Sequence, residues 1–300
     1  MARALRAVLV GCGGMAGAWL KPAATVPGLE IAGLVDIRRE NAERRREEFG
    51  LTRAVVGTDL RAMLKAVKPD IVFDVTVPES HCGVVTQALR NGCHVLGEKP
   101  MADSMTNARR MLAAARKSRR IYAVTQNYRY NAQIQALRQV AHSGRIGDVT
   151  TVHCDFFLGP HFGGFREQMD HVLLLDMAIH TFDAIRFVSG QSAAAVYARD
   201  WNPAGSWFRH GASAVATFEM TGGVVATYRG SWCAQGMSTP WNSQWRVLGS
   251  RGTATWDGAG EVKAQAQKGR KGFVREMADV PVTVRPVAHS GHDALIREFV

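Results

Sequence analysis

The chain has 300 residues, 46% hydrophobic and 21% charged, a balance typical of globular proteins and not of disordered chains. No apolar run approaches the roughly twenty residues that cross a bilayer, and residues 1–6 lack a signal-peptide core, so we expect a cytoplasmic protein with no membrane partner. The net charge of +11 could attract nucleic acid, but the basic residues are spread over helix faces without interleaved aromatic residues, so we expect no nucleic-acid partner.

The first predicted element is an apolar strand, residues 8–10, that runs into a glycine-rich turn and a helix. Gly11, Gly13 and Ala16 fit G-x-G-x-x-G/A, the pattern of a dinucleotide-binding turn. Gly11 permits the sharp turn, Gly13 lets a pyrophosphate approach the backbone, and Ala16 lets the helix pack closely on the strand. The helix N-terminus would then face the phosphates. The residues expected to bind the cofactor here are Gly11, Gly13, Gly14, Met15 and Ala16.

The second predicted strand, residues 30–35, ends at Asp36, and an acid about twenty residues after the glycines is where a ribose hydroxyl is usually bound. Asp36 favours NAD, because a carboxylate repels a 2′-phosphate. Arg38 and Arg39 follow directly, and an arginine there can accommodate that phosphate, so NADP stays open. The alternative is an ordinary glycine-rich turn with Asp36 as a helix cap.

Strands and helices alternate up to about residue 125, which predicts a parallel, doubly wound sheet. Helices are expected at 40–49, 60–67, 80–89 and 104–117, and strands at 71–75, 94–97 and 121–125. In such a sheet the carboxyl ends of the strands meet at one edge, where the ligand binds.

The pattern then changes to short strands separated by Gly, Pro and Ser, which predicts an antiparallel sheet with helices on one face. Helices are expected at 132–143 and 173–188, and residues 221–223 predict a hairpin turn. We therefore expect two domains, a dinucleotide-binding domain over 1–125 and an α+β substrate-binding and oligomerisation domain over 126–300.

Two turns at the predicted strand ends carry unusual residues. The first is Thr76-Val77-Pro78 with His81, and the second is Glu98-Lys99-Pro100, where the proline could sit in a cis peptide. Both lie at the edge expected to receive the nicotinamide half of the cofactor. On local sequence alone, Lys99 could equally be a solvated loop lysine.

Asp176 and His180 are spaced i, i+4 on a strongly apolar predicted helix, so they lie one turn apart on one face. An internal hydrogen bond in a core or subunit interface would also explain them. A metal pair has the same spacing, but no further ligands are evident nearby. The five cysteines are scattered without a C-x-x-C pair, so we expect free thiols and no metal site.

Taken together, these stretches resemble the Gfo/Idh/MocA family of oxidoreductases over essentially the whole chain. The motifs are Gly11-Cys12-Gly13-Gly14-Met15-Ala16, Asp36, Thr76-Val77-Pro78 with His81, Glu98-Lys99-Pro100, Gln126-Asn127-Tyr128-Arg129-Tyr130, and Asp176-x-x-x-His180. The resemblance implies a Rossmann domain followed by an α/β domain whose open sheet often forms oligomer contacts, so we expect a homodimer or homotetramer.

The resemblance also implies roles for site residues. Lys99, Asp176 and His180 would be catalytic, Glu98 would bind the nicotinamide ribose, and Thr76 and Pro78, with His81, would line the cofactor. The implied activity is hydride transfer between NAD(P) and a secondary hydroxyl of a sugar, polyol or inositol. The alternatives are glycoside cleavage through transient oxidation and a catalytically silent NAD(P)-sensing protein. Substrate-facing candidates are Tyr128, Arg129, His153 and Arg166, together with Asp176 and His180.

The chain departs from the family pattern at three places. His171-Val172 stands where members often carry glycines, and Asn131 stands where many have proline. Both departures lie where substrate should sit, so the substrate of other members does not transfer. The sequence also stops at Phe299-Val300 within a predicted helix, which predicts that a C-terminal segment is missing from it.

Overall fold

The computed structural model describes residues 3–269 and 271–300, and the chain forms two compact units. The first unit runs to Asn127 and takes up His289–Val300, and the second is Tyr128–Ala288. The sequence predicted one boundary near residue 125 and placed the last residues in the second domain. The structure instead returns residues 289–300 to the first unit.

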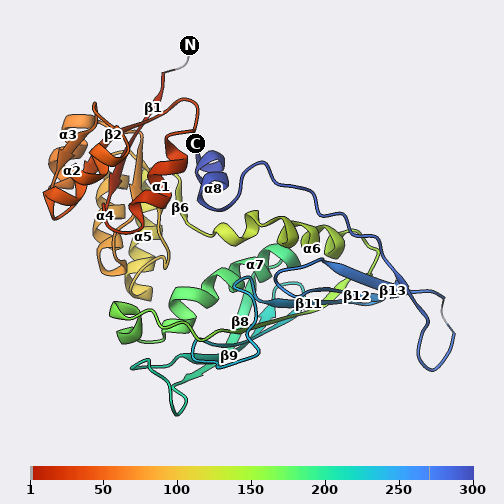
Figure 1. Cartoon of the computed structure of the whole chain (residues 1–300). Helices are drawn as coiled ribbons and strands as arrows, with labels where there is room; N and C mark the ends of the chain where they lie inside the picture. Colours follow the sequence, from red (N-terminus) through yellow and green to blue (C-terminus); the bar gives the residue numbers. More distant parts are fainter. Residues whose placement is uncertain (1–2, 270) are drawn as a thin grey trace. The chain divides into compact units, whose positions relative to one another are not determined.

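The first unit contains a six-stranded parallel sheet of order β3-β2-β1-β4-β5-β6. Figure 1 labels β1, β2 and β6 of this sheet. Its strands are β1 (Leu5–Val10), β2 (Leu29–Val35), β3 (Val55–Gly57), β4 (Ile71–Asp74), β5 (His94–Gly97) and β6 (Tyr122–Val124). Its helices are α1 (Ala16–Ala23), α2 (Arg39–Glu48), α3 (Leu60–Val67), α4 (Pro78–Arg90), α5 (Met105–Ser118) and α8 (Gly291–Phe299). This strand order is that of the Rossmann fold and confirms the predicted doubly wound sheet.

Sequence explains why these strands are central. β1 and β4 read as nearly continuous aliphatic runs, and Val8, Leu9, Val72 and Phe73 are fully buried. A parallel sheet covered by helices buries both faces of its strands, so the alternation of a half-exposed strand is absent. The strand order reverses between β1 and β4, which places the turns after these strands at the position where such sheets bind ligands.

The second unit contains an eight-stranded sheet of order β14-β13-β12-β11-β7-β10-β9-β8, antiparallel except between β7 and β10. Its strands are β7 (Val149–Phe157), β8 (Ala193–Trp201), β9 (Ser213–Met220), β10 (Val225–Ser231), β11 (Gln244–Gly249), β12 (Gly252–Trp256), β13 (Lys263–Gln267) and β14 (Met277–Asp279). Its helical segments are η1 (Asn127–Tyr130, which begins in the first unit), α6 (Ala132–His142), η2 (Gly164–Gln168), η3 (Leu173–Ala178) and α7 (Ile179–Ser189). The mostly antiparallel sheet and the hairpin at residues 221–223 are as predicted.

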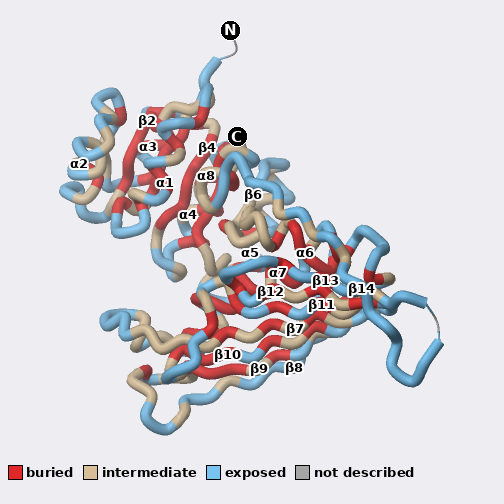
Figure 2. Tube along the Cα trace, turned by 45° about the vertical axis from the view of Figure 1, so that its right-hand side comes forward, coloured by how far each residue is buried: buried red, intermediate tan, exposed pale blue. Residues whose placement is uncertain are grey.

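One face of this sheet is covered and the other is open. In β7, Val152, Cys154 and Phe156 are buried, whereas His153 and Asp155 between them are half-buried. Helices α6 and α7 pack on the buried face, and the tube in Figure 2 shows the resulting alternation of buried and exposed residues along the strands. Side chains at odd positions of β7 therefore belong to the face opposite the helices.

The predicted helix over 173–188 differs from the structure in its first turn. Residues Leu173–Ala178 form a π-helical turn, η3, and the α-helix α7 begins only at Ile179. Single π turns insert one extra residue into a helix and occur frequently at functional sites. The five cysteines are free thiols. Among the residues described, no helix is both long and apolar enough to cross a membrane.

Candidate active site

The glycine turn after β1 has the geometry that a dinucleotide needs. Gly11 has φ +93°, and a Cβ there would lie 2.5 Å from the carbonyl oxygen of Val75, so only glycine fits. A Cβ on Gly13 or Gly14 would meet no atom within 4 Å, which leaves open space in front of the backbone. The first turn of α1 carries no acidic residue and no side-chain cap. Its N–H groups fit a diphosphate.

Asp36, directly after β2, binds the backbone of that turn. One carboxylate oxygen accepts the N–H of Cys12 at 2.7 Å, and the other accepts the N–H of Arg38 at 2.9 Å and the amide of Asn41 at 3.1 Å. A carboxylate has about four acceptor positions, so one is left for a ribose hydroxyl. The side chain of Arg38 is exposed.

The sequence analysis missed Arg45, which supports the same turn from α2. Its guanidinium donates to the carbonyl oxygens of Gly13 at 2.7 Å and Cys12 at 3.4 Å, and it pairs with Glu48. Arg45 stands in a run of three arginines that resembles a solvated helix face, so nothing local distinguished it.

The turn after β4 is built on a second acid that the sequence analysis missed, Asp74. This fully buried carboxylate accepts the hydroxyl of Thr76 at 2.6 Å and its N–H at 3.2 Å, and Nδ1 of His81 lies 2.9 Å away. His81 is itself 1% exposed, and Pro78 is the first residue of α4. His81 is therefore buried behind the turn, where it contacts Asp74, and Thr76 and Pro78 form the turn itself. In the sequence, Asp74 could have been noticed as an acidic residue at the end of an apolar predicted strand.

The turn after β5 carries Glu98 and Lys99, and the Lys99–Pro100 peptide is cis. The carboxylate of Glu98 accepts the indole N–H of Trp19 at 2.8 Å, Nε2 of His292 at 3.2 Å and the N–H of Lys99 at 3.0 Å. Burial alone would raise the pKa of Glu98, but these hydrogen bonds outweigh it and hold the pKa below its ordinary value. Glu98 is therefore ionised in the folded protein at neutral pH.

In the second unit, the π turn carries Asp176, and His180 follows in the first turn of α7. The two residues are 9% and 8% exposed. Arg166, from η2, donates from Nε to Asp176 at 2.7 Å, and its guanidinium lies over the rings of Phe162 and Phe165. The cation–π contacts with these two rings help to orient the Arg166 guanidinium, and with it the ion pair to Asp176.

Tyr128 packs directly on His180. Their rings are stacked at 4.8 Å between centroids with 12° between planes, and the Tyr128 hydroxyl donates to the carbonyl oxygen of Trp241 at 3.2 Å. Burial raises the pKa of Tyr128 to about 12, so it remains a neutral phenol. The second unit thus brings together four residues predicted from sequence, Tyr128, Arg166, Asp176 and His180.

Comparison with known proteins places this arrangement in a family. Residues 5–126 match the model of the oxidoreductase family with an NAD-binding Rossmann fold, and residues 134–255 match the GFO/IDH/MocA C-terminal domain. The chain belongs to the Gfo/Idh/MocA oxidoreductase family. This confirms the resemblance drawn from the motifs and identifies the first unit as the family's NAD-binding domain.

Three similar proteins illustrate the family. An uncharacterized protein, y4oX, from Sinorhizobium fredii is 31% identical over 83% of this chain and 71% of that protein. A D-glucoside 3-dehydrogenase from Escherichia coli is 35% identical, but the match spans 54% of this chain and less than half, 47%, of that enzyme. The crystal structure of an Agrobacterium radiobacter oxidoreductase with NAD⁺, L-tartaric acid and magnesium superimposes with a TM-score of 0.82 at 22% identity, covering 98% of this chain and 84% of that one, and supports the fold.

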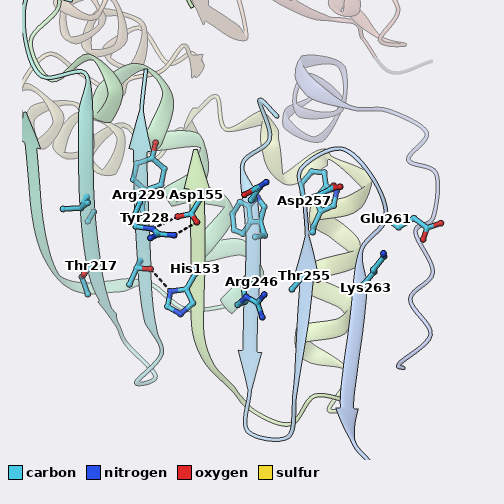
Figure 3. A pocket seen from close by; sticks show the side chains of 16 residues that line it. His153, Asp155, Thr217, Tyr228, Arg229, Arg246, Thr255, Asp257, Glu261 and Lys263 are labelled. Atoms are coloured by element: carbon cyan, nitrogen blue, oxygen red, sulfur yellow. Dashed lines mark hydrogen bonds and ion pairs between the residues drawn. The ribbon is translucent and has the colours of Figure 1, made fainter. Parts of the chain in front are cut away.

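Two candidates for substrate contact in this Gfo/Idh/MocA protein have other partners. The guanidinium of Arg129 forms a bidentate salt bridge with the buried carboxylate of Asp183. His153 lies on the open face of the sheet, where Nδ1 is 2.6 Å from the hydroxyl of Thr227 (Figure 3). Strand alternation turns His153 away from the helices that carry the Asp176 group.

The candidate site residues of this family member form two sets, each lying within its own unit. The first unit supplies the glycine turn, Asp36, the Asp74 turn, Glu98 and Lys99, and the second supplies the group around His180. Within residues 3–269 and 271–300, no cluster of three or more His, Cys, Asp or Glu side chains is placed to hold a metal ion.

Proposed function

We propose that this protein is an NAD(P)-dependent dehydrogenase or reductase that acts on a secondary hydroxyl of a sugar, polyol or inositol-like substrate. The observation that carries the proposal is that Asp176 and His180, four residues apart at the start of one helix, are both largely buried in a member of an oxidoreductase family. His180 is stacked on Tyr128, and Asp176 is held by Arg166. An imidazole can exchange a proton near neutral pH, which suits the role proposed for His180.

The bound nicotinamide supplies the hydride acceptor or donor. In the oxidative direction, His180 takes the proton of the substrate hydroxyl, because an imidazole has a pKa near the operating pH. The ammonium group of Lys99 stabilises the negative charge that develops on that oxygen. Asp176, fixed by Arg166, orients the hydroxyl towards the imidazole. In the reductive direction His180 returns the proton.

The proposed cofactor preference is NAD. Asp36 is fixed by three hydrogen bonds and retains one acceptor position, which suits a ribose hydroxyl and repels a 2′-phosphate. Arg38 is exposed at the same turn, so binding of NADP at lower affinity is compatible with this arrangement.

We also propose that a second copy of the chain covers the open face of the second sheet. This face lines a groove of about 1000 Å³ and carries both signs of charge (Figure 3). Arg229 pairs with Asp155, and Arg246, Lys263 and Glu261 lie farther along the sheet. In a two-fold symmetric contact the same surface of both copies meets. A surface that carries both positive and negative side chains can then pair opposite charges across the interface. Sedimentation of wild type and Arg229→Glu tests this, and a wild-type monomer at micromolar concentration would exclude it.

The activity is tested by following cofactor reduction across sugars, polyols and inositols with NAD and NADP in parallel. We expect NADH formation with one substrate class, lost in Asp176→Asn and His180→Ala and retained in Asp170→Asn, a change of an exposed acid in the same unit. Glycoside cleavage without net NADH would favour transient oxidation, and tight NAD binding with no turnover would favour a sensing protein. Either result would overturn the proposal.

A further inference from the structure

The last helix, α8, joins the first unit through a buried polar cluster of Trp19, Glu98 and His292. Trp19 is fully buried and Glu98 is 6% exposed. Trp19 donates to Oε1 of Glu98 at 2.8 Å, and Nε2 of His292 lies 3.2 Å from the same oxygen. Because an ionised carboxylate only accepts hydrogen bonds, Nε2 of His292 carries the proton in this contact.

These contacts fix the carboxylate of Glu98 from one side. Oε1 receives both donors and is saturated, whereas Oε2 accepts the N–H of Lys99 at 3.0 Å. The carboxylate cannot rotate without losing the hydrogen bonds at Oε1. Oε2 is therefore fixed at hydrogen-bond distance from the Lys99 N–H. One acceptor position remains on Oε2, which fits a ribose hydroxyl.

The three members differ in how firmly the fold holds them. Trp19 packs against Phe73, with ring centroids 5.4 Å apart, and β5 leads directly into Glu98. His292 arrives on a helix from the far end of the chain and contacts the Trp19 ring at 5.6 Å. Its helix is also held by Arg297, which donates to the hydroxyl of Thr25 and is oriented by Asp293 one turn earlier in α8. His292 and Arg297 thus both dock α8, but only His292 reaches Glu98.

We propose that His292 is a positioning residue for the turn that carries Lys99. It acts through Glu98: the imidazole fixes Oε1, and Oε2 in turn fixes the Lys99 peptide. The effect on turnover rests on the proposed function of Lys99, whereas the effect on the Lys99 peptide does not. No sequence motif indicated this residue, because the partners are 194 positions apart.

The test compares His292→Ala with His292→Gln and Arg297→Ala. Gln places an amide N–H where the imidazole Nε2 stood, and Arg297→Ala weakens the docking of α8 without touching Glu98. We expect His292→Ala to lower kcat roughly ten- to a hundredfold with little change in the substrate KM. His292→Gln should restore most of kcat, and Arg297→Ala should leave kcat unchanged. Equal losses in His292→Ala and Arg297→Ala would overturn the proposal.

A second measurement needs neither cofactor nor turnover. In protein labelled with ¹⁵N-lysine, the Lys99 amide resonance is assigned by its absence in Lys99→Arg. His292→Ala should shift this resonance and Arg297→Ala should not. An unshifted Lys99 amide in His292→Ala would overturn the proposal, even if the substrate panel showed no turnover at all. A shifted amide with no turnover in wild type would retain the positioning role and reject the proposed function.

Discussion

The acidic residues of the candidate site have different partners in the two units. In the first unit, Asp36, Asp74 and Glu98 each stand at a strand end and accept N–H groups of the adjoining backbone turns. In the second unit, Asp176 and Asp183 instead hold arginine side chains. Backbone N–H groups are partners of all three acids in the first unit, beside side chains, whereas Asp176 and Asp183 bind arginine side chains.

The difference matches what each unit is expected to bind. A diphosphate and ribose are recognised by backbone N–H groups and fixed turns, so their site is built at the ends of parallel strands. A small hydroxylated substrate needs a proton acceptor and directed side chains, so its site is built on a helix whose first turn is π-helical. The following predictions separate the two strategies, from the largest expected effect to the smallest.

Replacing Lys99 by Met removes the charge of the first unit expected to act on the substrate. We expect turnover to fall by about a thousandfold while the Kd for NAD stays within a few-fold of wild type, because the charge acts on the developing alkoxide. Steady-state kinetics and calorimetric titration check this. Lys117→Met, a change of an exposed lysine in the same unit, should alter neither, and undiminished turnover in Lys99→Met would remove Lys99 from the catalytic group.

Two alanine substitutions in the glycine turn should have different consequences. Gly11→Ala should destabilise the protein by at least about 3 kcal/mol, because φ is +93° and the Cβ would meet the Val75 carbonyl. Gly13→Ala should change stability by less than about 0.5 kcal/mol, because its Cβ meets no protein atom, but weaken NAD binding about tenfold or more. Urea denaturation and NAD titration of both variants decide. Equal losses of stability in the two variants would contradict the assignment of Gly11 to the turn and Gly13 to cofactor contact.

Two arginine substitutions compare the acid pairs of the second unit. Arg129→Gln should cost about 2 kcal/mol of stability, because Asp183 is 6% exposed and loses a charged partner. Arg166→Gln should cost less stability but lower kcat/KM by about tenfold or more, because Asp176 loses its orientation. If Arg129→Gln had the larger effect on kcat/KM at equal stability, Arg129 would belong to the substrate site.

Asp36→Ala should shift the cofactor preference towards NADP by about tenfold in the ratio of the two Kd values, since it removes the repulsion of a 2′-phosphate. Arg38→Ala is the matched change on the same turn and should weaken NADP more than NAD. A ratio unchanged in Asp36→Ala would place the ribose elsewhere.

The smallest expected effect is on how the free energy of unfolding depends on pH in the acidic range. The folded-state pKa of Glu98 is held below its ordinary value of 4.5, so its ionisation stabilises the fold above that pH. This contribution is lost as pH falls from about 4.5 through the folded-state pKa. Denaturation midpoints between pH 3 and 7 should therefore fall less steeply in Glu98→Gln than in wild type. A steeper fall would mean that burial, which raises the pKa, dominates.

The sequence predicted the first unit well because its determinants are local. Gly11 and the strand before it are neighbours in the chain, and the alternation of strands and helices dictates a parallel sheet. Arg45 and His292 were missed because their roles depend on contacts that join distant elements. Asp74 was missed although its partners Thr76 and His81 are close in sequence, because an acid that ends an apolar strand does not by itself show what it binds. The position of His153 on the open face could not be predicted, because packing decides which face of a strand meets the helices. The π turn at Asp176 leaves no mark in the apolar pattern.

The return of α8 to the first unit bears on how the chain folds. Arg297 hydrogen-bonds to Thr25 across a sequence separation of 272 residues, so the first unit is complete only after the whole second unit has been made. The chain between Thr25 and Arg297 forms a long loop, but closing a longer loop costs only slightly more entropy. If the second unit folds first, the effective length of this loop is shorter. During synthesis, Trp19 and the α1 surface therefore remain uncovered until the last helix leaves the ribosome. A protein truncated before residue 289 would carry that surface permanently.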